Sequence, residues 1–151
     1  MYFNKALIHP QLDVQNQKDL LKIMADDLLG NECVKDSFLN AVLTRESEYP
    51  TGLEVKNIGF AIPHTDSKHV LESQICLATL KDNILFSDMT DINNEIPVKI
   101  VFMLAMKDPG DQITTLQKLM ELFSNKNFAN KILELDDKKE ILEELEKNGI
   151  Y

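Results

Sequence analysis

The residue pair with the clearest chemical potential is Pro63-His64. Pro63 ends an apolar, strand-like run over residues 59–62, because proline fixes its own φ, donates no backbone hydrogen bond and favours an extended residue before it. His64 is therefore expected at the end of a strand. Neutral imidazole is both largely unprotonated at pH 7 and nucleophilic, so His64, one of only three histidines, is a candidate nucleophile.

Arg45 is the second candidate. Helical spacing of apolar residues predicts a helix over residues 34–45, and residues 49–52 form a turn signal that leads toward the strand before His64. A strand and turn of this kind can bring Arg45 near His64. A guanidinium binds two phosphoryl oxygens at once, which is what a phosphohistidine site needs. The alternative for Arg45 is a cation that favours the negative end of a helix.

Three other kinds of site fit the sequence poorly. Zinc needs three or four ligands at recognisable spacing, whereas His64 and His69 lie five residues apart and neither Cys33 nor Cys76 is close to them in sequence. The chain has no G-x-S-x-G elbow of a serine hydrolase and no P-loop. We therefore expect no metal and no cofactor.

The elements that must position these residues follow from the hydrophobic periodicity. Helices are expected over residues 17–30 after an N-cap at Asn16, and over residues 34–45, 111–123, 128–133 and 138–147. Strands are expected over residues 58–62, 74–80 and 98–106, with a short edge strand at residues 84–86 that pairs with residues 74–80 across a turn at residues 81–83. Two helices, a group of strands and three helices predict an α/β fold with helices on both faces of a sheet.

Length and composition limit the class of protein. A chain of 151 residues is expected to form one domain over residues 1–151. Its net charge of −9 argues against nucleic acid and against anionic membrane surfaces. Two cysteines far apart in sequence fit buried, reduced thiols. Without a long apolar run or a signal peptide, we expect a cytoplasmic protein that does not insert into a membrane.

Two motifs give the chain a family resemblance: R-E-S-E-Y-P-T-G at residues 45–52 and G-F-A-I-P-H at residues 59–64. Together they resemble the enzyme IIA component (EIIA) of the bacterial phosphoenolpyruvate-dependent sugar phosphotransferase system (PTS), in its fructose–mannitol superfamily. The resemblance extends over nearly the whole chain. It is strongest to the galactitol-specific IIA, which shares the first motif and a histidine five residues after the active one, here His69.

The resemblance implies a fold, an activity and partners. The fold is a mixed sheet of about five strands with helices on both faces. His64 matches the histidine that accepts a phosphoryl group from the phosphocarrier protein HPr and donates it to a cysteine of a IIB component, during galactitol-like uptake through a membrane IIC permease. Arg45 matches the arginine near that histidine. The alternative function is a nitrogen-regulatory-type IIA module that controls partner proteins through its phosphorylation state.

Three further residues are candidates to assist His64. Gln112 occupies the position at which many superfamily members have a second histidine; it can donate a neutral NH₂ to a phosphoryl oxygen or lie exposed in a first helical turn. His69 can contact the phosphoryl group, orient His64, or be a solvated loop histidine. Thr65 can stabilise the phosphoryl group. We also expect an apolar docking surface around His64, with Phe60 or Ile113 contributing to it.

Overall fold

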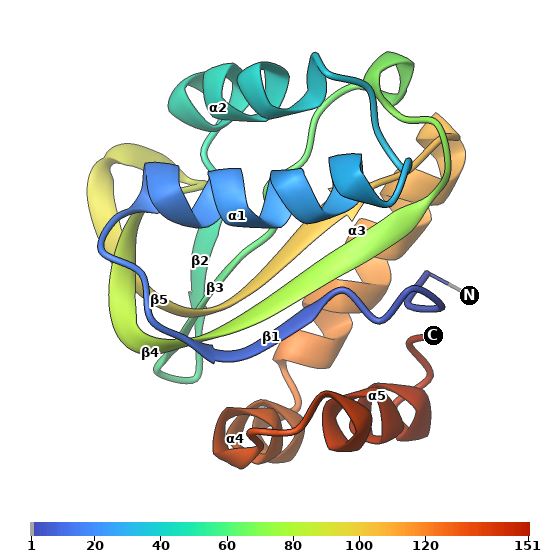
Figure 1. The fold of residues 1–151 in the computed structure, drawn as a ribbon. Helices are drawn as coiled ribbons and strands as arrows, with labels where there is room; N and C mark the ends of the chain where they lie inside the picture. The colour runs from blue at the N-terminus through green and yellow to red at the C-terminus, as the bar shows by residue number, and fades with distance from the viewer. Residues whose placement is uncertain (1) are drawn as a thin grey trace.

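A mixed, five-stranded sheet organises residues 2–151, which are the residues described by this computed structural model (Figure 1). The elements in chain order are β1 (Ile8–Leu12), α1 (Gln17–Gly30), α2 (Phe38–Glu48), β2 (Gly52–Val55), β3 (Ile58–Ala61), the short 3-10 helix η1 (Ser67–His69), β4 (Gln74–Asp88), β5 (Asp91–Ala105), α3 (Pro109–Phe123), α4 (Lys126–Glu134) and α5 (Lys138–Lys147). The predicted α/β fold is confirmed.

The long β4–β5 hairpin is the centre of the sheet. β4 and β5 pair antiparallel, β1 lies parallel to β4, and β3 lies parallel to β5 and antiparallel to β2. Close packing of β3 on β5 depends on Gly59, since a Cβ atom there would lie 2.0 Å from the carbonyl oxygen of Pro97. This contact places the end of β3, and with it His64, beside the apolar half of β5.

Two hydrophobic cores lie on opposite faces of the sheet. One contains buried side chains of α1, α2, β4 and β5, and the other contains those of α3, α4 and α5 with the opposite faces of β4 and β5. Figure 1 shows α1 and α2 on one side of the sheet and α4 and α5 on the other. The alternation of side chains along each strand explains how one hairpin supplies both cores.

The predicted edge strand at residues 84–86 is wrong. These residues continue β4, and they pair with residues 96–98 of β5 rather than with residues 74–80. Residues 81–83 form an irregularity within β4 and not a turn. The chain reverses at Met89-Thr90 instead, where the Asp88 side chain accepts hydrogen bonds from the Thr90 amide and hydroxyl, each at 2.9 Å.

The predicted helix ends are confirmed in part. The second helix begins at Phe38 rather than Val34, because Val34 forms an antiparallel bridge with Val70. The predicted N-cap at Asn16 is confirmed, since its side chain accepts a hydrogen bond from the Asp19 amide at 2.8 Å. α5 has the predicted bounds. Within residues 2–151, no helix has the length and apolar character needed to cross a membrane.

Candidate functional site

His64 lies three residues beyond the end of β3. Its segment is held against β5 by a hydrogen bond of 3.0 Å from the Leu104 amide to the Pro63 carbonyl. His64 Nδ1 lies 2.7 Å from the main-chain oxygen of Ile62. A carbonyl only accepts, so Nδ1 must carry the proton and donate. This hydrogen bond fixes the tautomer and leaves Nε2 with its lone pair free to act as a nucleophile.

The surroundings of His64 favour a neutral ring. Burial lowers the pKa of His64 below its usual 6.5, and the nearby Arg45 charge lowers it further. The hydrogen bond to Ile62 and the charge of Asp66 act in the opposite direction but do not reverse the shift. At pH 7 the imidazole is therefore the unprotonated, nucleophilic form.

Arg45 lies in the last turn of α2, as predicted, and its charge has no ion-pair partner among residues 2–151. Its guanidinium carbon lies 5.4 Å from the centre of the Tyr49 ring, a distance at which cation–π attraction holds the side chain. The Nε atom is buried and has no hydrogen-bond partner in the part of the chain that the structure describes. An unpartnered buried donor next to a neutral histidine suits an anionic group.

A groove of about 460 Å³ runs between α2 and the segment that follows His64. Arg45, Thr65 and His69 all line it, so three of the predicted residues meet at one surface. The remaining lining residues are Ser37, Asn40, Ala41, Thr44, Glu48, Tyr49, Asp66 and Lys68. The groove is open to solvent, and Thr65, which follows His64 in the sequence, lines it, whereas His64 itself is not among the lining residues.

The buried carboxylate of Glu46 is linked to His64 by a series of hydrogen bonds. Glu46 is 6% exposed and accepts two hydrogen bonds from Thr51, one from its amide and one from its hydroxyl, each at 2.7 Å. The Thr51 hydroxyl oxygen in turn accepts from the Ile62 amide at 3.2 Å. Glu46, Thr51 and Ile62 thus form a continuous chain to the carbonyl that orients His64.

Glu46 is the site residue that sequence reasoning missed. Burial raises its pKa from 4.5 to about 7, although the two hydrogen bonds from Thr51 and the charge of Arg45 lower it in part. A charged residue between Arg45 and Ser47 is typical of an exposed helix end, which hid its burial. The available signal was its place beside Arg45 in the same motif that contains Thr51.

The assisting residues differ in how well their environments fit the predictions. Thr65 is buried and lines the groove. His69 Nδ1 lies 2.7 Å from the Ser37 hydroxyl, so one ring nitrogen joins η1 to the residue before α2. Gln112 lies in the first turn of α3 and is partly buried, with a buried amide oxygen that has no hydrogen-bond partner within residues 2–151. Gln112 does not line the groove that Arg45 and His69 share.

The two residues expected on the docking surface, Phe60 and Ile113, differ in solvent exposure. Phe60 is fully buried and stacks on Phe123 with ring centres 3.9 Å apart, so the prediction that it contributes to a surface is wrong. Its side chain faces the α3–α5 core because β3 alternates its side chains across the sheet. Ile113, near the start of α3, is 60% exposed and remains available to a partner.

Comparison with known proteins places this geometry in context. The family model for the phosphoenolpyruvate-dependent sugar phosphotransferase system, EIIA 2, matches residues 1–148. The galactitol-specific EIIA component of the Escherichia coli PTS (strain K12) is 25% identical over 122 residues, which are 81% of each chain.

Solved structures share the fold. A PTS IIA protein (PtxA) from Streptococcus mutans superposes with a TM-score of 0.81 at 19% identity, covering 97% of this chain and 92% of that one. Enzyme IIA for mannitol from Escherichia coli, solved in complex with phosphorylated enzyme IIB, superposes with a TM-score of 0.78 at 16% identity, covering 94% and 95%.

Proposed function

Because the chain belongs to the EIIA type 2 family of the sugar phosphotransferase system, we propose that His64 is its phosphoryl acceptor and that Arg45 stabilises the transferred group. The observation that carries this proposal is the hydrogen bond from His64 Nδ1 to the Ile62 carbonyl at 2.7 Å. It leaves Nε2 free in a neutral ring near a guanidinium whose Nε has no hydrogen-bond partner among residues 2–151.

The transfer needs positioning and charge stabilisation more than covalent assistance. The P–N bond of the donor phosphohistidine breaks while a bond forms between phosphorus and His64 Nε2. The two nitrogens lie in line with phosphorus, and Arg45 hydrogen-bonds the equatorial oxygens. The Nδ1 proton stays on the ring, held by Ile62, so the phosphorylated imidazole carries positive charge and remains a good leaving group for the onward step.

The assisting residues take roles consistent with their environments. Rotation of the Gln112 amide exchanges its oxygen for an NH₂ group, so the unpaired position of Gln112 can become a donor to a phosphoryl oxygen. The Thr65 hydroxyl is a second donor from the groove. The bond between His69 and Ser37 holds the far side of the groove, so His69 shapes the site rather than contacting phosphorus.

We infer HPr as the donor and a cysteine of a IIB component as the acceptor. Both cysteines of this chain are buried, and burial raises the pKa of Cys33 and of Cys76, so neither suits onward transfer. The likeness to a galactitol-specific component favours a galactitol-type IIB, with a IIC permease as an indirect partner.

Reconstitution tests this proposal. The purified chain is incubated with labelled phosphoenolpyruvate, enzyme I and HPr, and the modified residue is mapped. We expect one label per chain, on His64, which then moves to the cysteine of an added galactitol-type IIB. Absence of label on His64 would refute the acceptor role. Label that reaches His64 but moves to no IIB protein would favour the regulatory module instead.

A further inference from the structure

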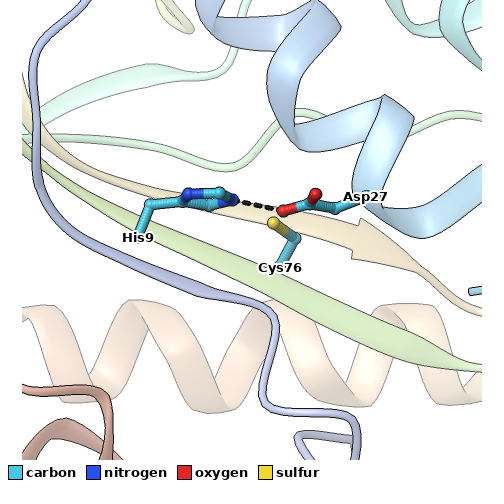
Figure 2. A group of neighbouring side chains, drawn as sticks. All are labelled: His9, Asp27 and Cys76. Atoms are coloured by element: carbon cyan, nitrogen blue, oxygen red, sulfur yellow. Dashed lines mark hydrogen bonds and ion pairs between the residues drawn. The ribbon is translucent and has the colours of Figure 1, made fainter. Parts of the chain in front are cut away.

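A second group of chemically capable side chains lies away from the groove. His9 on β1, Asp27 near the end of α1 and Cys76 on β4 point toward one another (Figure 2). Their ligand atoms all lie within 4.8 Å of one another, and among residues 2–151 this is the one group of three or more His, Cys, Asp or Glu donors so placed. β4 and β5 lie between β1 and the β3 strand that leads to His64.

The sheet register explains how residues so distant in sequence meet. His9 lies opposite Ala78 in the parallel β1–β4 pair, so it projects on the same face as Ala78 and Cys76. That face is covered by α1, whose last turn carries Asp27. The three donors therefore come from three separate elements that the core already fixes, which makes the cluster preorganised rather than assembled from a loop.

Electrostatics at this position favour a cation. Asp27 lies in the last turn of α1, where the helix dipole is negative and the helix has no basic residue of its own. Within residues 2–151, its carboxylate has one basic side chain as a partner, through a bond between His9 Nε2 and Asp27 Oδ2. The Cys76 sulfur also has no hydrogen-bond partner among residues 2–151.

Access and donor chemistry indicate the class of ion. The His9 and Asp27 side chains are 27% and 35% exposed, whereas Cys76 is fully buried, so an ion can enter from one side and meet sulfur at the bottom. Imidazole nitrogen, thiolate sulfur and carboxylate oxygen are the ligands of Zn²⁺, and three protein ligands leave a fourth position for water. A thiolate selects against Mg²⁺ and Ca²⁺, which prefer oxygen ligands.

We propose that His9, Asp27 and Cys76 form a binding site for a divalent transition metal of the Zn²⁺ class. Binding releases the thiol proton of Cys76, because the sulfur ligates as thiolate. The metal bridges β1, β4 and α1 and so ties the N-terminal strand to the sheet. This proposal is independent of phosphoryl transfer.

Cobalt(II) titration tests the site directly, because a thiolate ligand gives a charge-transfer band in the near ultraviolet. The full chain is reduced, freed of metal and titrated with Co²⁺. We expect saturation at one ion per chain, a thiolate band, and loss of that band when Zn²⁺ is added. No saturable binding, or a cobalt spectrum without a thiolate band, would overturn the proposal and leave His9 and Asp27 as a hydrogen-bonded pair.

Two cysteine variants provide the matched control, because both thiols are fully buried. C76S should lose the band and C33S should keep it; the same loss in both would overturn the assignment. Circular dichroism checks that each variant is folded. If C76S does not fold, H9Q replaces it and should weaken Co²⁺ binding about tenfold or more. Unchanged affinity in H9Q would also overturn the proposal.

Discussion

His64 and His9 are the same residue type next to a proline, yet their surroundings prepare them for different chemistry. His64 donates from Nδ1 to an uncharged main-chain oxygen and lies near the cation of Arg45. His9 bonds through Nε2 to the carboxylate of Asp27 beside a buried thiol. The environment of His64 leaves its Nε2 free to act as a nucleophile. In His9, Nε2 instead faces the Asp27 carboxylate.

The two rings therefore differ in the group that each one bonds, and we expect this partner to determine what each histidine can do. A carbonyl partner fixes the tautomer without adding charge. A carboxylate partner favours a cation, either on the ring or bound between the two side chains. Each difference can be tested by a change at one residue.

The largest expected effect is the loss of phosphorylation in H64A. Removal of the imidazole removes the proposed phosphoryl acceptor, so labelling from phosphorylated HPr should fall to background while circular dichroism stays unchanged. Co²⁺ binding at His9 should persist in H64A, since the two sites lie on separate strands. Label that survives in H64A, on His69 or elsewhere, would break the distinction between the histidines.

Arg45→Lys should slow phosphoryl uptake by about 10-fold to 100-fold. Lysine keeps the charge but loses the two-pronged geometry, and one charge-assisted hydrogen bond contributes about 1.5–3 kcal/mol. The melting temperature should change little, because Arg45 forms no ion pair within residues 2–151. Single-turnover transfer from phosphorylated HPr measures the effect. A wild-type rate would leave Arg45 as a helix-end cation.

Glu46 predicts a specific dependence of stability on pH. Its folded pKa of about 7 lies above the usual 4.5, so the folded chain holds a proton that the unfolded chain releases. The corresponding stability is full below pH 4.5 and is lost as the pH rises through about 7. Its size is on the order of 3 kcal/mol.

The variant E46Q removes that titration. Urea unfolding from pH 4 to 8 should show a decline in wild type that E46Q lacks, once the trend common to both proteins is subtracted. Parallel curves would mean that Glu46 does not titrate in this window. A modest slowing of phosphorylation in E46Q is also expected, because Thr51 and Ile62 link Glu46 to the carbonyl that orients His64.

A smaller effect concerns the titration of His64 itself. Burial and Arg45 lower its pKa below 6.5, so the ring stays neutral as the solution becomes mildly acidic. NMR titration of the imidazole should give a midpoint below 6.5, and R45A should move that midpoint upward. A midpoint above 6.5 in the wild-type protein would contradict the neutral acceptor.

The sequence predicted the parts of the molecule that local rules determine. The Asn16 side chain caps α1 by accepting a hydrogen bond from the amide of Asp19, three residues later. Pro63 ends the extended segment before His64. The predicted turn at residues 81–83 is wrong, because polar residues between two apolar runs resemble a turn in sequence. The packing of Ile84 and Phe86 into the same core instead keeps β4 continuous.

The rest of the site depends on contacts that no local pattern contains. Whether Glu46 is buried depends on how Thr51 folds back over the end of α2. The cluster of His9, Asp27 and Cys76 forms only when β1 pairs with β4 under α1. The carbonyl of Ile62 gives no sequence signal, since every residue has one.

The most direct test of the central claim is to identify the phosphorylated nitrogen by NMR on ¹⁵N-histidine-labelled protein after transfer from HPr. We expect coupling of phosphorus to Nε2 of His64, with the Nδ1 proton still present and bonded to the Ile62 carbonyl. Phosphorus on Nδ1 of His64, or on any other residue, would contradict it.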